Sequence, residues 1–503
     1  MSLATTACCA GAICALALAS TGTAAAGAPK PAAASKVAPA PKPPELGPTV
    51  TRIVTDIRKQ NDAYRKLLAL CDGIGTRISG SPALEKATEW AVAAMRADGL
   101  ENVRTEPVMV RRWIRGEESA ELLEPRPLAL HMLGLGNSVG TPAEGLTGEV
   151  VVATDEKTFE ALGDRVKGHI VLFDNPMPAF DSKKGTGYGD AVRFRISGPR
   201  LAAERGALAV LIRSVTAHSL GAPHTGVTVY GDTKVKIPGA ALSVEDAALL
   251  DRLVTSGQKV VVRLKMGARD AGEVPSANVI GELRGRELPD EFVVIGGHLD
   301  SWDVGQGAHD DGAGVVMSME AVAALRRLDA RPRRTVRVVL FTNEENGGAG
   351  AGQYAIDHRA EVDRHVAAIE TDMGGFRPRG FGIQMPDKAA QARALNVLRG
   401  LSGPLKPLGP LVFEGDRSGS DVGPLGAKGV PALMLLVDES RYFDVHHSPA
   451  DTPEKVDPTE LSEATAAMAA MAYVLADRPE RIDAVVGKPA KPGKSTKSGE
   501  PGK

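Results

Sequence analysis

Apolar positions in the C-terminal half of the chain follow two alternating patterns. Short runs of aliphatic and β-branched residues predict buried strands, and the segments between them repeat apolar residues every three to four positions, as amphipathic helices do. The predicted strands are residues 291–295, 335–341, 365–370 and 431–437, and the predicted helices are residues 314–325 and 349–358. Apolar strands separated by helices are typical of a mixed, mostly parallel sheet with helices on both faces. We therefore expect an α/β fold.

The N-terminal half predicts a helical region followed by a second, smaller unit. Helical periodicity covers residues 53–71 and 83–98, with a turn at Ser79–Pro82 between them. The texture then changes to short strand-like runs separated by many Gly and Pro residues, at 148–152, 169–173, 209–212 and 260–264, with helix-like segments at 199–205 and 244–253. This pattern predicts a smaller α/β domain inserted into the main one.

The two ends of the chain have compositions that do not build a core. No charged residue occurs between Met1 and Pro29, and residues 7–19 are apolar or small, so residues 1–26 predict a signal peptide, with an Ala-rich leader as the alternative. Residues 27–48 are rich in Ala and Pro, as extended linkers are. The expected division is signal peptide 1–26, linker 27–48, main domain 49–127, inserted domain 128–272, main domain again 273–486, and a disordered basic tail 487–503.

Composition and charge exclude several classes of partner. The 503 residues carry 60 Lys and Arg against 62 Asp and Glu, a net charge of −2, so nothing in the balance calls for nucleic acid or a polybasic membrane anchor. No segment reaches the run of about eighteen apolar residues that an integral membrane span needs. Of the four cysteines only Cys71 lies outside the predicted signal peptide, so the mature chain cannot form an internal disulfide.

Acidic residues and histidines follow the predicted strands. Sites in open α/β sheets lie beyond the carboxyl ends of the strands, so one edge should gather His298 and Asp300, His309–Asp311, Glu344 and Glu345, Asp372, and His446–Asp451. Each group alone has an ordinary explanation as a turn, a solvated loop or a polar histidine. Together, the carboxylates would repel one another unless a cation lay between them. Imidazole and carboxylate donors without thiolate suit zinc best, leave manganese, cobalt and iron open, and argue against calcium.

These motifs resemble a known family. The strings Gly297–Asp303, Gly307–Gly314 and Asn343–Glu345, then Asp372 and the spacing His447-x-x-x-Asp451-Thr452, are similar to peptidase family M28 of co-catalytic zinc aminopeptidases and carboxypeptidases, and within it to the carboxypeptidase Q branch. The resemblance extends from about Thr49 to Asp477, and the inserted segment resembles a protease-associated domain. It implies a zinc-peptidase-like fold with two Zn²⁺ ions per chain.

The resemblance also implies a role for each site residue. His298 and Asp372 would bind one metal, Glu345 and His447 the other, and Asp310 would bridge them. Glu344 would be the general base, and Asp300 would orient the His298 imidazole.

One position departs from the wider family. Many members have Tyr directly before the last metal-binding His, placed to assist the oxyanion, whereas this chain has His446 there. Either His446 or another donor takes that role, and Tyr442 is a candidate for it.

The sequence therefore predicts an exported hydrolase. We expect a two-zinc exopeptidase in the periplasm or outside the cell that acts on dipeptides or short peptides. The resemblance favours an aminopeptidase- or dipeptidase-like enzyme that cleaves next to a free α-amino group, while the sequence itself leaves the peptide end open. Two alternatives remain: a catalytically inactive, receptor-like binding protein on the same scaffold, and a one-zinc, glutaminyl cyclase-like acyltransferase. The sequence leaves open a homodimer, and it leaves open whether the insert is a lid, a length filter or a dimer contact.

Overall fold

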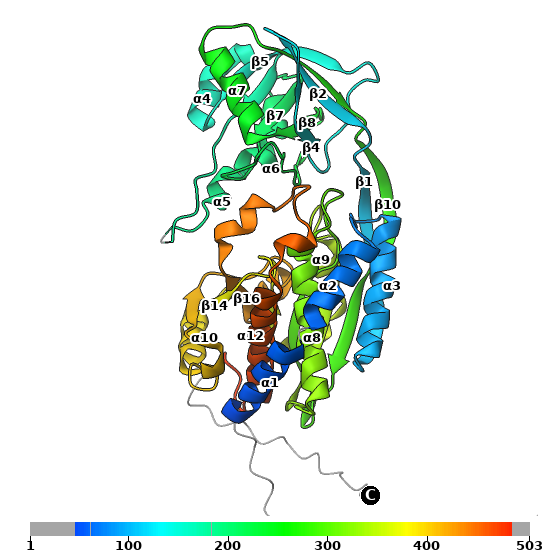
Figure 1. The fold of residues 1–503 in the computed structure, drawn as a ribbon, viewed down its shortest axis with the longest axis vertical. Helices are drawn as coiled ribbons and strands as arrows, with labels where there is room; N and C mark the ends of the chain where they lie inside the picture. The colour runs from blue at the N-terminus through cyan, green and yellow to red at the C-terminus, as the bar shows by residue number, and fades with distance from the viewer. Residues whose placement is uncertain (1–45, 61, 183, 485–503) are drawn as a thin grey trace, which may run out of the picture. The chain divides into compact units, whose positions relative to one another are not determined.

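Two sheets organise the chain, as a computed structural model shows for residues 46–60, 62–182 and 184–484 (Figure 1). The predicted signal peptide, the predicted basic tail and most of the predicted linker lie outside these residues. The linker prediction is wrong at its end, because helix α1 (Leu46–Gln60) begins before Pro48. A proline in the first helical turn sacrifices no helical hydrogen bond, so the proline did not mark a linker here.

The main sheet has eight strands in the order β1-β10-β12-β11-β13-β16-β14-β15. Their bounds are β1 (Glu101–Ile114), β10 (Arg269–Leu283), β11 (Leu288–His298), β12 (Arg334–Phe341), β13 (His365–Glu370), β14 (Pro378–Gln384), β15 (Val412–Gly415) and β16 (Ala432–Val437). The central strands β12, β11, β13 and β16 are mutually parallel, whereas β10 and β14 join them antiparallel. The predicted mixed α/β sheet is confirmed.

Helices cover both faces of this sheet. Along β12, Val336, Val338 and Leu340 belong to one apolar cluster and Val339 and Phe341 to another, because successive side chains of a strand point to opposite faces. The first cluster includes α1, α2 (Asp62–Gly73), α3 (Pro82–Ala97), α8 (Ala313–Arg327), α10 (Lys388–Gly400) and α12 (Pro458–Asp477), and the second includes α9 (Ala349–Asp357) and α11 (Gly423–Gly426). Helix α12 packs against both α1 and α8 (Figure 1). No helix in the described ranges is long and apolar enough to cross a bilayer.

The second sheet also has eight strands, in the order β3-β2-β9-β5-β6-β7-β8-β4. The strands are β2 (Glu118–Glu124), β3 (Leu128–Leu130), β4 (Met132–Gly134), β5 (Leu146–Ala153), β6 (Ile170–Phe173), β7 (Ala209–Arg213), β8 (Gly239–Leu242) and β9 (Val261–Met266). The helices are α4 (Glu156–Leu162), α5 (Tyr188–Ala191), α6 (Arg193–Ala203) and α7 (Val244–Thr255). Strand pairing puts residues 118–124 with this sheet and 269–272 with the main one, so the predicted bounds 128 and 272 are both displaced.

In the sequence, the second sheet is inserted between β1 and β10, which are neighbouring strands of the main sheet. Strands β1 and β10 run antiparallel, and Trp113 pairs with Asp270 and Ile114 with Arg269 at their ends. The chain therefore leaves and re-enters the main sheet at adjacent points. The assignment of the inserted segment as a protease-associated domain stays a prediction.

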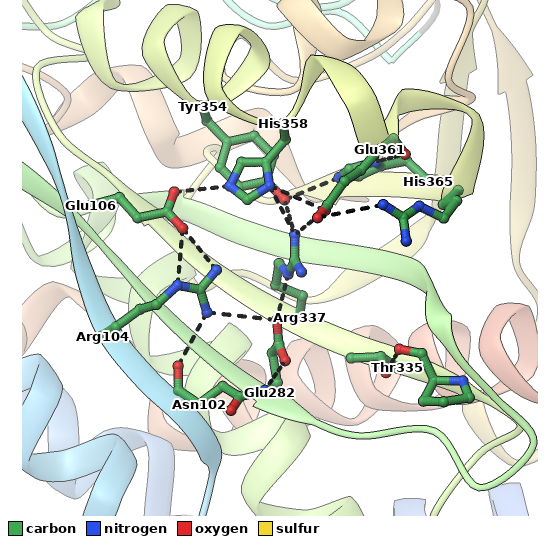
Figure 2. A network of polar contacts seen from close by, with 12 residues as sticks. Asn102, Arg104, Glu106, Glu282, Thr335, Arg337, Tyr354, His358, Glu361 and His365 are labelled. Carbon is green, nitrogen blue, oxygen red and sulfur yellow. Dashed lines mark hydrogen bonds and ion pairs between the residues drawn. The ribbon is translucent and has the colours of Figure 1, made fainter. Parts of the chain in front are cut away.

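A buried network of charges ties the edge of the main sheet to its centre (Figure 2). Arg337 on β12 donates from Nε to Glu282 Oε1 on β10 at 2.8 Å and from Nη1 to the Tyr354 hydroxyl on α9 at 3.0 Å. His358, just after α9, reaches Glu106 Oε2 on β1 with its Nε2 at 2.9 Å. The network therefore fixes α9, which follows the Glu344–Glu345 turn, against the edge strands.

Candidate metal centre

The carboxyl ends of the parallel strands converge on one site. His298 ends β11, Glu345 lies in the turn after β12, Asp372 follows β13, and His447 lies in the segment after β16. Asp310 lies in the turn that leads into α8. Parallel neighbours end at the same edge of a sheet, which explains how residues so far apart in sequence meet.

Asp310 lies between two histidines and offers a different oxygen to each. Its Oδ1 is 3.3 Å from His298 Nε2, and its Oδ2 is 3.1 Å from His447 Nε2. Asp372 Oδ1 lies 3.5 Å from the same nitrogen of His298, and Glu345 Oε2 lies 3.1 Å from the same nitrogen of His447. The structure thus gathers all five predicted ligand residues into two groups that share Asp310.

The donor atoms of this cluster fit a divalent metal. His298 Nε2, Asp310 Oδ2, Glu345 Oε1 and Asp372 Oδ1 are buried and have no hydrogen-bond partner among the described residues. Buried polar atoms without partners are costly, and a bound cation would satisfy them. Overlapping sets that could hold an ion include His298, Asp310 and Glu345. Imidazole and carboxylate donors are those that zinc accepts.

Neighbouring charges shift the pKa values of these predicted ligand residues. Burial lowers the pKa of His447, but Glu345 and Asp310 outweigh burial and raise it to about 10. The pKa of His298 is also raised, because Asp372 and Asp310 outweigh burial. Burial raises the pKa of Glu345 to about 8, and Asp310 adds to the shift. Metal binding must displace the protons held here.

Asp300 supports the site through contacts other than the predicted one. His298 Nδ1 lies 2.9 Å from the main-chain oxygen of Asp300 and 3.9 Å from its carboxylate Oδ1. The carboxylate instead accepts the Ser79 hydroxyl at 2.8 Å and the main-chain N–H of Glu344 at 3.1 Å. The carbonyl is therefore the nearer acceptor for the imidazole, and the carboxylate holds the turn that carries Glu344.

Two further carboxylates fix the loops of the site. Asp451 accepts the main-chain N–H groups of His309 and Asp310, at 2.8 and 3.1 Å. Asp311 accepts the main-chain N–H groups of His298 and Gly314, at 3.1 and 3.0 Å. The sequence motif included Asp451 but gave it no role. In the structure, Asp451 holds the turn that carries Asp310.

A cavity of about 720 Å³ opens onto the cluster and is lined by Glu344, Tyr442 and His446, and by four of the predicted ligand residues, Asp310, Glu345, Asp372 and His447. Burial raises the pKa of Glu344 to about 7. The carboxylates of Asp372 and Asp300 add to this shift, whereas His298 opposes it. The His446 ring stacks on His447 at 3.5 Å. Burial and the charges of nearby carboxylates raise the pKa of Tyr442. Its hydroxyl therefore stays protonated and can donate a hydrogen bond.

Sequence reasoning missed the residues that the second sheet brings to this cavity. Arg195 on α6 is 5% exposed, and its Nη1 lies 3.3 Å from His447 Nδ1. The loop His224–Gly226 contacts the main chain of His446 and His447. No sequence motif marks either feature, because each depends on contacts between distant parts of the chain.

Comparisons with known proteins agree with this geometry. Residues 278–472 match the family described as peptidase family M28. Carboxypeptidase Q of Bos taurus is 41% identical over 407 residues, which are 81% of this chain and 84% of that protein. The chain belongs to peptidase family M28. Carboxypeptidase Q of Homo sapiens is also 41% identical, over the same shares of the two chains, so the expected resemblance is confirmed and this M28 member is a metallopeptidase.

Solved structures of M28 peptidases share the fold. A peptidase M28 precursor from Shewanella amazonensis has a TM-score of 0.81 at 34% identity, over 87% of this chain and 98% of that one. BSAP, a zinc aminopeptidase from Bacillus subtilis, has a TM-score of 0.61 at 22% identity, over 84% of this chain and 96% of that one. The second similarity concerns the fold alone.

Proposed function

We propose that this M28 peptidase is a two-zinc exopeptidase that hydrolyses dipeptides or short peptides. The observation that carries the proposal is the position of Asp310, whose two oxygens face two different imidazoles at 3.3 and 3.1 Å. This arrangement suits a carboxylate that would be shared between two cation positions. His298 and Asp372 would complete one position, and Glu345 and His447 the other.

The residues of the chain divide the work of hydrolysis. Zinc ions bound at the cluster would lower the pKa of a water molecule and polarise the scissile carbonyl. Glu344, which lines the cavity without being one of the ligands, takes the proton of the attacking water and passes it to the leaving amine. Asp300 holds the Glu344 turn in place. Tyr442 and His446 are the two candidates for a hydrogen bond to the developing oxyanion.

Counting zinc and removing it tests this proposal. We expect two zinc ions per chain by elemental analysis and loss of dipeptide hydrolysis in the presence of a chelator, with recovery when zinc is returned. One tightly bound ion would favour the cyclase-like alternative. Metal binding without hydrolysis of any peptide would favour the receptor-like one, and hydrolysis that survives metal removal would contradict the mechanism.

Arg195 supports recognition of a free carboxylate on the substrate. If Nε2 of His447 binds metal, Nδ1 carries the proton and donates to the Thr225 carbonyl, 3.3 Å away. Arg195 then has no acceptor on that ring, and its Nε has no hydrogen-bond partner among the described residues. Arg195 also lies near the Tyr188 ring, at 5.7 Å, and Gly226, and it lines the cavity. A buried guanidinium that faces the cavity without an anion suits a carboxylate ligand.

Replacing Arg195 should therefore change substrate choice. For Arg195→Met we expect kcat/KM on free dipeptides to fall about 10- to 100-fold, since hydrogen bonds to charged groups are worth roughly 1.5–3 kcal/mol. The same dipeptides with an amidated C-terminus should lose little. Arg193→Met is the matched control, because Arg193 lies on the same helix but pairs with Glu156. Equal losses on free and amidated substrates would remove this role.

Export is proposed on the predicted signal peptide at residues 1–26 alone. A periplasmic or extracellular location would give the enzyme access to peptides outside the cytoplasm. The predicted homodimer also stays a proposal.

A further inference from the structure

The last predicted metal ligand, His447, has an unusual backbone. Its φ is +60°, in the left-handed region that non-glycine residues rarely adopt. Such a conformation persists only where the surrounding structure holds it. Its own segment, which follows β16, supplies no regular secondary structure at this point. Turn hydrogen bonds flank it, from the His446 N–H to the Tyr442 carbonyl at 3.0 Å and from the Ser448 N–H to the Val445 carbonyl at 3.1 Å, but the His447 carbonyl and ring are held by contacts from elsewhere.

They come from one loop of the second sheet, His224–Gly226, between β7 and β8. Thr225 contacts His447 twice: its main-chain N–H donates to the His447 carbonyl at 2.9 Å, and its carbonyl lies 3.3 Å from His447 Nδ1. The first contact fixes the backbone, and the second fixes the ring. An acceptor at Nδ1 holds the proton there when the ring is neutral, so that Nε2, on the side of Asp310 and Glu345, can bind a metal.

His224 secures the residue next to this ligand. It is 1% exposed, and its Nδ1 donates to the main-chain oxygen of His446 at 2.7 Å. The main-chain N–H of His224 donates to Ser214 Oγ at 2.8 Å, at the end of β7. A continuous set of hydrogen bonds thus connects the second sheet to the peptide that carries His447.

The remaining contacts anchor the loop without touching the ligand. The Thr225 hydroxyl donates to the Gly134 carbonyl at 2.7 Å, and the Gly226 carbonyl accepts the N–H of Gly136 at 3.0 Å. The loop is therefore fixed from behind by β4 and its neighbours, and it presents only main-chain groups and His224 to the metal cluster.

We propose that the loop His224–Gly226 orients His447 for metal binding, and that His224 is a positioning residue for that metal position. The proposal rests on the proposed function, because it assigns a task to the insert within the two-zinc site. The insert then does more than cover the cavity: the ligand set of one metal position is complete only with a loop from the second sheet in place. Asp372 and His298, at the other position, receive no contact from this loop.

The test compares zinc affinities in the full-length protein by competition with a chelator. For His224→Leu we expect one of the two zinc ions to bind about 10- to 100-fold more weakly, as is usual when a partner that orients a ligand is lost, while the other ion binds as before. His224→Asn, which keeps an N–H near the position of Nδ1, should restore most of the affinity. Thr216→Val is the matched control, since it removes a hydrogen bond of the same β7–β8 segment, from the Thr216 hydroxyl to the His218 carbonyl at 2.9 Å, that does not reach His446 or His447.

Several outcomes would overturn the proposal. Unchanged binding of both ions by His224→Leu would overturn it. An equal loss in Thr216→Val would also overturn it, because that loss would point to general packing of the β7–β8 segment. If His224→Leu does not fold, Ser214→Ala carries the test: it should weaken the same single ion several-fold, and no change would overturn the proposal. A wild-type protein that never binds two ions would instead contradict the proposed function, so the two failures are distinguishable.

Discussion

Glu344→Gln should reduce kcat on dipeptides by about 10²- to 10⁴-fold, which corresponds to roughly 3–5 kcal/mol of lost transition-state stabilisation. The amide has the shape of the carboxylate but cannot accept a proton. Because Glu344 is not among the five ligands, zinc content and KM should stay close to those of the wild type. Steady-state kinetics together with elemental analysis would measure all three quantities.

The neighbouring glutamate provides the matched comparison for this variant. Glu345 Oε2 lies 3.1 Å from His447 Nε2, so Glu345→Gln should lose or weaken one zinc ion, whereas Glu344→Gln should keep both. If Glu344→Gln stays fully active, or if it loses metal as readily as Glu345→Gln, the assignment of Glu344 as the general base is wrong.

Asp310→Ala should remove both zinc ions and reduce hydrolysis to the background rate. Asp310 is shared by the two ligand groups, at 3.3 Å from His298 Nε2 and 3.1 Å from His447 Nε2. Its loss also leaves two buried histidines without their common carboxylate, whose negative charge favours cation binding. Metal counting on the purified variant, with circular dichroism to verify folding, would measure the effect.

Asp372→Ala provides the contrast for the bridging role. Asp372 contacts only the His298 side of the cluster, so this variant should lose one ion and keep the other. The same stoichiometry in both variants would argue against a shared carboxylate, and with it against a paired metal site.

The central strands, and the convergence of the predicted ligand residues at their ends, could be predicted because each strand has a local sequence signal. Strands β11, β12, β13 and β16 are buried on both faces. A predicted ligand lies at or within a few residues of the end of the first three, whereas His447 lies in the longer segment after β16. The parallel pairing of these strands then brings their ends together. Local sequence was therefore enough for this part of the fold and for its site.

Other elements lack such a local signal. Helix α12 is rich in Ala and buried on nearly every side, so it has no polar face to reveal a helical period. Strand β1 lies at the edge of the main sheet and carries charged residues such as Arg104, Glu106 and Arg111 along its length. Exposure of an edge strand interrupts the apolar run that marks a buried one.

The contributions of the second sheet were unpredictable for a different reason. Arg195 and His447 are 252 residues apart, and neither their spacing nor their local sequence indicates that they meet. Only the packing of the insert on the strand ends brings them together. The same holds for the carboxylate of Asp300, whose partners Ser79 and Glu344 come from opposite sides of the insert in sequence.

The two ends of the insert join the main sheet at paired residues, so the insert could be exchanged as one segment. Ile114 and Arg269 are paired neighbours, so a tight hairpin turn could join them and leave every hydrogen bond of the main sheet intact. Exchange of this one segment could alter which peptides enter the cavity while the five ligands stay in place. Any replacement would, however, have to bring its own partner for the final histidine, and this requirement limits which segments natural selection or protein engineering can graft there.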